Sequence, residues 1–162
     1  MKRSSIRLNV EKHGISILRV SVAIIFLWFG VLKFFPGNAA EGLAGATISW
    51  LTFGMIDRNL AVFLLGVLEC LIGLGLLFKP ALRFVVPVLY LQLLGTLVPL
   101  AAFGSETWKA PLMPTLEGQY IIKNVVLVAA AIVVGASARG SKLIVDPVVA
   151  KEAKRKQEEI MG

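Results

Sequence analysis

The sequence predicts an all-α protein, an integral membrane bundle of four helices with both termini in the cytoplasm. The 162 residues are 57% hydrophobic, with a mean hydropathy of +0.80, which is too apolar for a soluble domain of this size. The apolar residues gather in four long runs, each close to the roughly 20 residues that a helix needs to cross a bilayer. Most basic residues lie outside these runs, where they set topology and contact anionic lipid.

The first run, residues 15–35, follows a polar and basic segment, residues 1–14, which we expect to be cytoplasmic. A cleaved signal peptide is the alternative, because a basic start and an apolar run precede a short Asn-Ala-Ala sequence. The run is longer than the roughly 7–15 residues of a signal core and contains Arg19 and Lys33. We therefore favour a retained first span.

Residues 36–59 are rich in small residues and too broken to span. We expect an outer loop with a short helix at the membrane interface, where Trp50 and Phe53 would lie. The second span, residues 60–78, follows directly, and Asn59 is a candidate helix cap.

The second span contains one charged residue, Glu69, near its midpoint. A carboxylate at the bilayer centre costs at least about 2.5 kcal/mol unless it is paired. Gly66 and Gly73 share a helix face with Glu69, and small residues let a second helix approach closely. We therefore expect Glu69 to point into the bundle and to find a partner there.

The third span, residues 82–103, contains Pro87 and Pro99, which membrane helices tolerate when neighbours satisfy the freed carbonyls. Residues 104–118 form a second outer loop.

The fourth span covers residues 119–138, and a charged cytoplasmic tail, residues 139–162, follows it. Thr115 is a candidate N-cap, and Glu117 would lie in the first turn, where the helix dipole favours it.

Polar residues follow one stripe on each span, which predicts a shared polar interior. At about 1.5 Å per residue, Lys33 lies about 12 Å and Lys123 about 9 Å outward from Glu69. The outer half of the bundle is then a donor-rich pocket, suited to a flat apolar ligand with carbonyl or anionic oxygens and closed from above by residues 36–59 and Glu117. The candidate ligand-pocket residues are Lys33, Glu69, Gln92, Glu117, Tyr120, Lys123 and Asn124.

Purely structural roles stay open at this stage. Lys33 can snorkel to the headgroups, Glu69 can be a structural ion-pair member, and Gln92 and Asn124 can join helices without binding a ligand. The single cysteine and single histidine predict no internal disulfide and no metal site.

Three segments resemble the YkgB-like group of small inner-membrane proteins, which is related to the DoxX superfamily. They are FLWFGVLKFFPG at 26–37, LECLIGLGLL at 68–77 and PTLEGQYIIKNVVLVAAA at 114–131. The resemblance extends over residues 15–138 and implies a four-helix bundle in the inner (plasma) membrane. Some DoxX relatives are subunits of quinone-linked sulfur or redox systems, and one YkgB relative is associated with resistance to reactive chlorine, a stress response.

The polar residues that match the group are Lys33, Glu69, Glu117, Gln119, Lys123 and Asn124. Many relatives have a Lys-Asp pair where this chain has Lys123-Asn124, so this chain lacks one carboxylate there. The resemblance transfers no established catalytic residue, and we assign none.

Three functions compete. The first is a redox-linked or oxidative-stress component that binds a quinone-like ligand. The sequence has no haem, flavin or iron–sulfur motif, so we expect no covalently bound cofactor. The electrons would then need a membrane or periplasmic redox partner. The second is a small transporter or channel subunit, which would need a homo-oligomer. The third is a structural or chaperone-like bundle without catalysis. Each places the chain in the lipid bilayer, and none involves nucleic acid.

We predict that both termini lie in the cytoplasm. Residues 1–14, 79–83 and 139–162 contain twelve of the 17 Lys and Arg residues, and the two outer loops contain two, so the positive-inside rule gives this orientation. Reporter fusions at Gly162 and within residues 104–118 measure it. A reporter that is active only in the periplasm should work in the loop, and its activity at Gly162 would overturn the topology.

Overall fold

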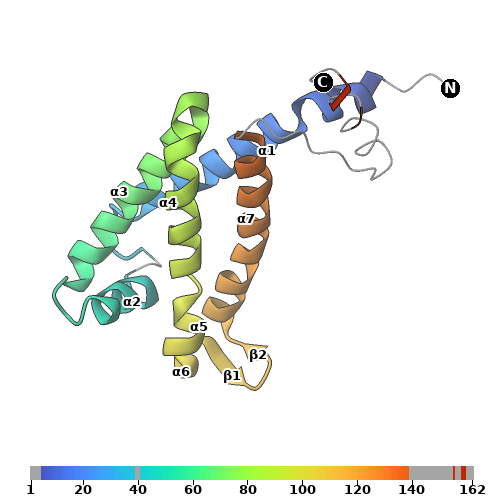
Figure 1. Ribbon diagram of the computed structural model, residues 1–162. Helices are drawn as coiled ribbons and strands as arrows, with labels where there is room; N and C mark the ends of the chain where they lie inside the picture. The colour runs from blue at the N-terminus through green and yellow to red at the C-terminus, as the bar shows by residue number, and fades with distance from the viewer. Residues whose placement is uncertain (1–4, 39–40, 139–154, 156–157, 160–162) are drawn as a thin grey trace.

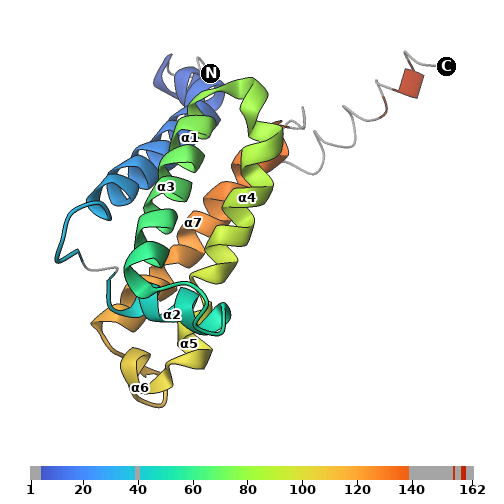
Figure 2. The ribbon, with the colours of Figure 1, turned by 90° about the vertical axis from the view of Figure 1, so that its left-hand side faces the viewer.

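A computed structural model describes residues 5–38, 41–138, 155 and 158–159. Four long helices run side by side as a bundle (Figures 1 and 2): α1 (Ser5–Leu32), α3 (Arg58–Leu77), α4 (Leu82–Gly95) and α7 (Leu116–Ala138). The described residues contain four helical segments long and apolar enough to cross a membrane, namely His13–Leu32, Arg58–Leu77, Lys79–Ala102 and Leu116–Ser137. The predicted helical class and its four candidate spans are confirmed.

The connections gather at the two ends of the bundle. The short 3₁₀ helix η1 (Lys79–Ala81) joins α3 to α4 at one end. The opposite end holds all the other short elements (Figure 1): α2 (Leu43–Leu51), α5 (Val98–Ala102), α6 (Gly104–Thr107), and the antiparallel strands β1 (Trp108–Ala110) and β2 (Met113–Pro114). The helix expected within residues 36–59 is α2, and the second predicted loop contains α6 and the two strands.

Side-chain caps explain where two of the long helices begin. The carboxylate of Asp57 accepts a hydrogen bond from the backbone N–H of Asn59 at 2.9 Å, so the cap of α3 is Asp57 and the assignment to Asn59 is wrong. The hydroxyl of Thr115 accepts from the N–H of Gly118 at 3.1 Å, which confirms Thr115 as the N-cap of α7. Glu117 lies in the first turn of α7, as expected.

Two predicted spans differ in extent from the helices. Helix α1 begins at Ser5, well before the predicted span, and ends at Leu32, so Lys33 lies in the turn that follows. The third span is interrupted between α4 and α5. Proline has no N–H, so Pro99 cannot donate the helical hydrogen bond to the carbonyl of Gly95, and α4 ends at that glycine.

Helices α1 and α3 pack almost backbone to backbone because glycines line their contact. A Cβ added at Gly73 would lie 2.9 Å from the carbonyl oxygen of Ala23 and 2.9 Å from the nitrogen of Leu27. A Cβ at Gly66 would lie 3.0 Å from the carbonyl oxygen of Gly30. The prediction that this face of α3 receives another helix is confirmed, and the partner helix is α1.

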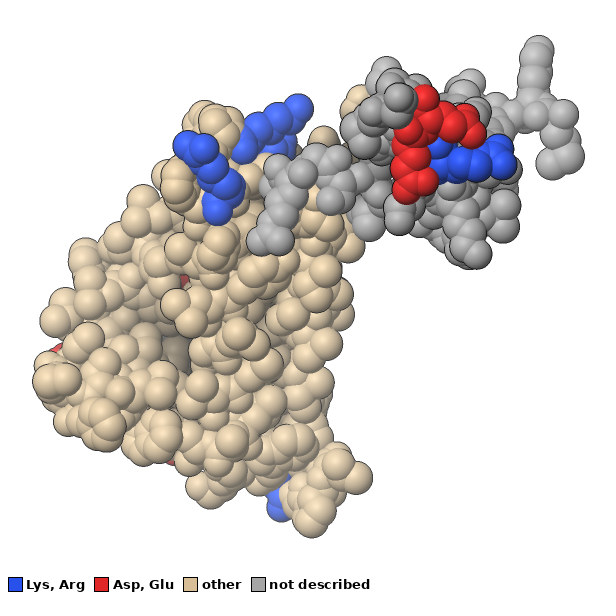
Figure 3. Space-filling view, in the orientation of Figure 1, with Lys and Arg blue, Asp and Glu red and all other residues tan. Residues whose placement is uncertain are grey.

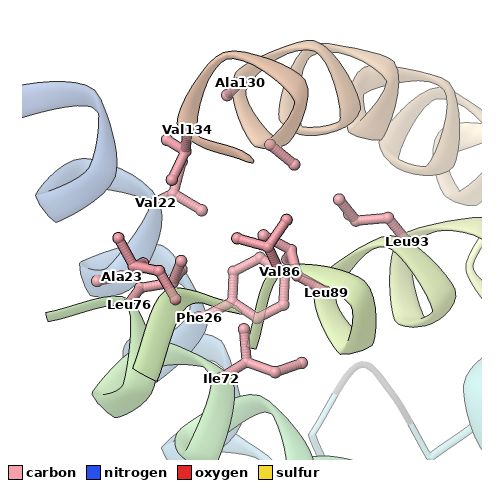
Figure 4. Close-up of a cluster of buried hydrophobic side chains, with 12 residues drawn as sticks. Val22, Ala23, Phe26, Ile72, Leu76, Val86, Leu89, Leu93, Ala130 and Val134 are labelled. Atoms are coloured by element: carbon pink, nitrogen blue, oxygen red, sulfur yellow. The ribbon is translucent and has the colours of Figure 1, made fainter. Parts of the chain in front are cut away.

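The apolar core lies toward the η1 end of the bundle and extends along α4 to Leu93, and all four long helices contribute to it (Figure 4). Its labelled residues are Val22, Ala23, Phe26, Ile72, Leu76, Val86, Leu89, Leu93, Ala130 and Val134. Many large apolar side chains outside the core are exposed, including Trp28, Phe84, Leu91 and Val126. The side of the molecule seen in Figure 3 is mostly uncharged between its two ends, as expected for a surface that faces lipid.

We expect Gly73→Ala to lower the stability of the detergent-solubilised protein by about 1–3 kcal/mol, because overpacking displaces backbone rather than a flexible side chain. Gly95→Ala is the matched control, since its Cβ would meet no atom within 4 Å. Thermal unfolding of the two variants measures the difference. An equal effect of both substitutions would contradict the close α1–α3 contact.

Candidate functional site

A buried ion pair joins the turn after α1 to α3. The ammonium of Lys33 donates to Oε2 of Glu69 at 2.6 Å and to the carbonyl oxygen of Phe29 at 3.3 Å. The two charged side chains are only 10% and 9% exposed. The expected interior orientation of Glu69 is therefore confirmed, and its partner is Lys33.

Gln92 of α4 completes the immediate surroundings of the carboxylate. Its Nε2 donates to Oε1 of Glu69 at 3.2 Å. Each carboxylate oxygen therefore has its own donor, Lys33 for Oε2 and Gln92 for Oε1. Because the amide nitrogen faces the carboxylate, the amide oxygen is left as an acceptor. This Oε1 of Gln92 is buried and has no hydrogen-bond partner among the described residues. We call Lys33, Glu69 and Gln92 the polar centre.

A second hydrogen bond, one helical turn further along α4, reaches α7. Asn124 donates from Nδ2 to the hydroxyl oxygen of Thr96 at 3.3 Å, and that hydroxyl donates to the carbonyl of Leu93 at 2.6 Å. Thr96 follows Gln92 by four residues, so both lie on one face of α4. Polar side chains therefore link all four long helices, through the pairs α1–α3, α3–α4 and α4–α7.

The turn after α1 positions Lys33. The Asn38 side chain donates to the carbonyl of Lys33 at 3.4 Å and to Oε1 of Glu41 at 3.1 Å. The same Glu41 oxygen accepts from the N–H of Gly37 at 2.9 Å. The candidate residues did not include Asn38 and Glu41, although the Pro-Gly-Asn sequence at 36–38 is a turn signal.

Three candidate residues lie apart from the polar centre, on the exposed surface of α7. The ammonium of Lys123 lies 4.0 Å from the centre of the Tyr120 ring, as a cation–π pair, and Glu117 is exposed in the first turn. Asn124 precedes the buried Ala131 by seven residues and so shares its inward face, whereas Lys123 is turned about 100° away. The structure thus brings together Lys33, Glu69 and Gln92, whereas Asn124 bonds to Thr96 in a separate contact.

An open groove of about 640 Å³ lies at the α2 end of the bundle. Residues of α2, the turn after it, the start of α3 and the end of α5 line it: Ala46, Ser49, Trp50, Leu51, Phe53, Gly54, Arg58 and Phe103. The sequence predicted that Trp50 and Phe53 would cover a pocket above Glu69. Instead, both residues line this separate groove.

The described residues include no group of three or more His, Cys, Asp or Glu that could hold a metal ion. The fold and the polar centre define a helical bundle with four candidate membrane spans and an ion pair buried between them. The chain matches no protein-family model, no curated protein and no solved structure.

We predict that Glu69→Ala destabilises the detergent-solubilised protein by about 3 kcal/mol, because it leaves the Lys33 ammonium buried without its counter-charge. Glu69→Gln should cost less, because it keeps the shape and can accept hydrogen bonds. The double variant Lys33→Met/Glu69→Gln should lose less stability than the sum of the losses measured in the two single variants.

The exposed ion pair between Arg155 and Glu159, 3.6 Å apart and four residues apart in sequence, provides the control. Glu159→Gln should change stability by no more than about 0.5 kcal/mol. Chemical or thermal unfolding of each variant measures these values. Additive effects of the Lys33 and Glu69 substitutions would show that the two residues do not interact.

Proposed function

We propose that the chain is a multi-pass protein of the inner (plasma) membrane, of the DoxX-like type, with both termini in the cytoplasm. The four candidate spans and the concentration of basic residues outside them support this assignment. We further propose that it binds a quinone-like ligand at the polar centre and acts as a redox-linked or oxidative-stress component.

The observation that carries this proposal is the unused hydrogen-bonding capacity of the polar centre. The Gln92 amide oxygen is a buried acceptor with no partner in the described part of the chain. A lysine ammonium has three N–H donors, and two acceptors are assigned to Lys33. One donor and one acceptor therefore lie close to a carboxylate, which matches a ligand that alternates between a carbonyl and a hydroxyl.

Each residue then has a distinct role. The remaining N–H of Lys33 donates to a quinone carbonyl, and Gln92 Oε1 accepts from a quinol hydroxyl. Oxidation of a quinol releases two protons and two electrons. Glu69 is the proton partner and takes up one of the two protons, because a carboxylate next to the ligand can act as a general base, and the second proton leaves to water. The electrons pass to a membrane or periplasmic partner protein.

A purely structural function is the competing explanation, and one observation favours it. The polar side chains connect all four long helices, and such bonds hold membrane helices together without any ligand. The two explanations differ in what they expect of Gln92. A structural role requires only the hydrogen bond that the amide nitrogen of Gln92 donates to Glu69. Ligand binding also requires the free amide oxygen of Gln92.

We expect a short-chain quinone to bind the detergent-solubilised protein, and Lys33→Met and Gln92→Leu to weaken the binding about tenfold each, the loss expected for one hydrogen bond to a charged or buried group. Lys123→Met is the matched control, since Lys123 is exposed and contacts Tyr120. Calorimetry or ligand fluorescence measures the affinities. Equal affinity in all four proteins, or no binding, would leave the structural function as the better explanation.

A further inference from the structure

The groove between α2, α3 and α5 has no role in the proposed function. It lies where α3 begins, at Arg58, which is also the first residue of a candidate membrane span. In the proposed membrane location, on which this inference rests, the groove lies at the end of the hydrocarbon-spanning region, the level at which lipid headgroups meet acyl chains.

One charged side chain, that of Arg58, lines this otherwise uncharged groove. Arg58 is exposed and has no ion pair among the described residues. The neighbouring carboxylate of Asp57 caps α3 through the N–H of Asn59 and does not line the groove. A guanidinium presents a planar fork of donors that matches a phosphate group.

Aromatic and aliphatic side chains form the walls. Trp50 of α2 and Phe103, the residue after α5, meet edge to face with ring centres 6.3 Å apart. This contact packs two of the elements that line the groove against each other. The volume of about 640 Å³ lies within the usual range for a small-ligand site. Apolar walls next to one cation suit an amphiphile with an anionic head.

The backbone at Phe53 supplies an independent observation. Phe53 has φ of 53°, in the left-handed region that favours glycine, and the residue is 92% exposed. A large apolar side chain at a disfavoured backbone position, with little contact to the rest of the protein, contributes little to folding. A ligand in the groove would give this ring a contact.

We propose that the groove binds one anionic phospholipid, with its phosphate on Arg58 and its acyl chains against Trp50, Phe53 and Phe103. The head is anionic rather than zwitterionic, because none of the described residues that line the groove is acidic and could bind an ammonium group.

The test compares the binding of phosphatidylglycerol and phosphatidylethanolamine to the detergent-solubilised protein, by native mass spectrometry and by the lipid-dependent rise in Tm. Phosphatidylglycerol should bind about tenfold more tightly. Arg58→Gln should remove this preference, and Arg58→Lys should retain part of it. Lys109→Gln is the matched control, because Lys109 is an exposed lysine in β1, at the same end of the bundle, and does not line the groove. This variant should bind as the wild type does.

Phe53→Gly separates lipid binding from folding. Glycine relieves the left-handed backbone, so the Tm without lipid should stay equal or rise, while the affinity for phosphatidylglycerol falls several-fold. Equal binding of the two lipids by the wild type would overturn the proposal. So would an unchanged affinity in Phe53→Gly, which decides the question even if Arg58→Gln does not fold.

Discussion

The ion pair between Lys33 and Glu69 is the interaction on which the polar part of the bundle depends. Two charges buried between helices are favourable only when they are close and when hydrogen bonds satisfy their remaining atoms. The glycine contact between α1 and α3 provides the closeness, and Gln92 and the carbonyl of Phe29 provide further hydrogen bonds. The side chain of Asn38 then holds the lysine backbone in place.

The interior of the bundle combines two kinds of chemistry. All four long helices contribute to an apolar core toward η1, which extends along α4 to Leu93. The polar centre adjoins this core near the middle of α3, and the bond between Thr96 and Asn124 lies further along α4. The apolar core stabilises the packing of the four helices, so the bundle tolerates the unsatisfied acceptor of Gln92.

The polar centre and the groove differ in exposure and charge. The centre is enclosed, and each of its charges has a partner. The groove is open, and its arginine has no ion pair in the described structure. This contrast fits the two proposed ligands, which differ in kind: a quinone-like head at the polar centre and a lipid in the groove.

The sequence by itself determined the number of candidate spans, the short helix between the first two, the cap at Thr115 and the inward face of Glu69. Each of these depends on local composition or on helical periodicity, which a single segment contains. Only the tertiary structure decided that Lys33 rather than Lys123 meets Glu69, that Tyr120 and Lys123 face outward, and that Arg58 lines a groove. These outcomes depend on how far each helix rotates and where it crosses its neighbours, and the packing of all four helices sets both.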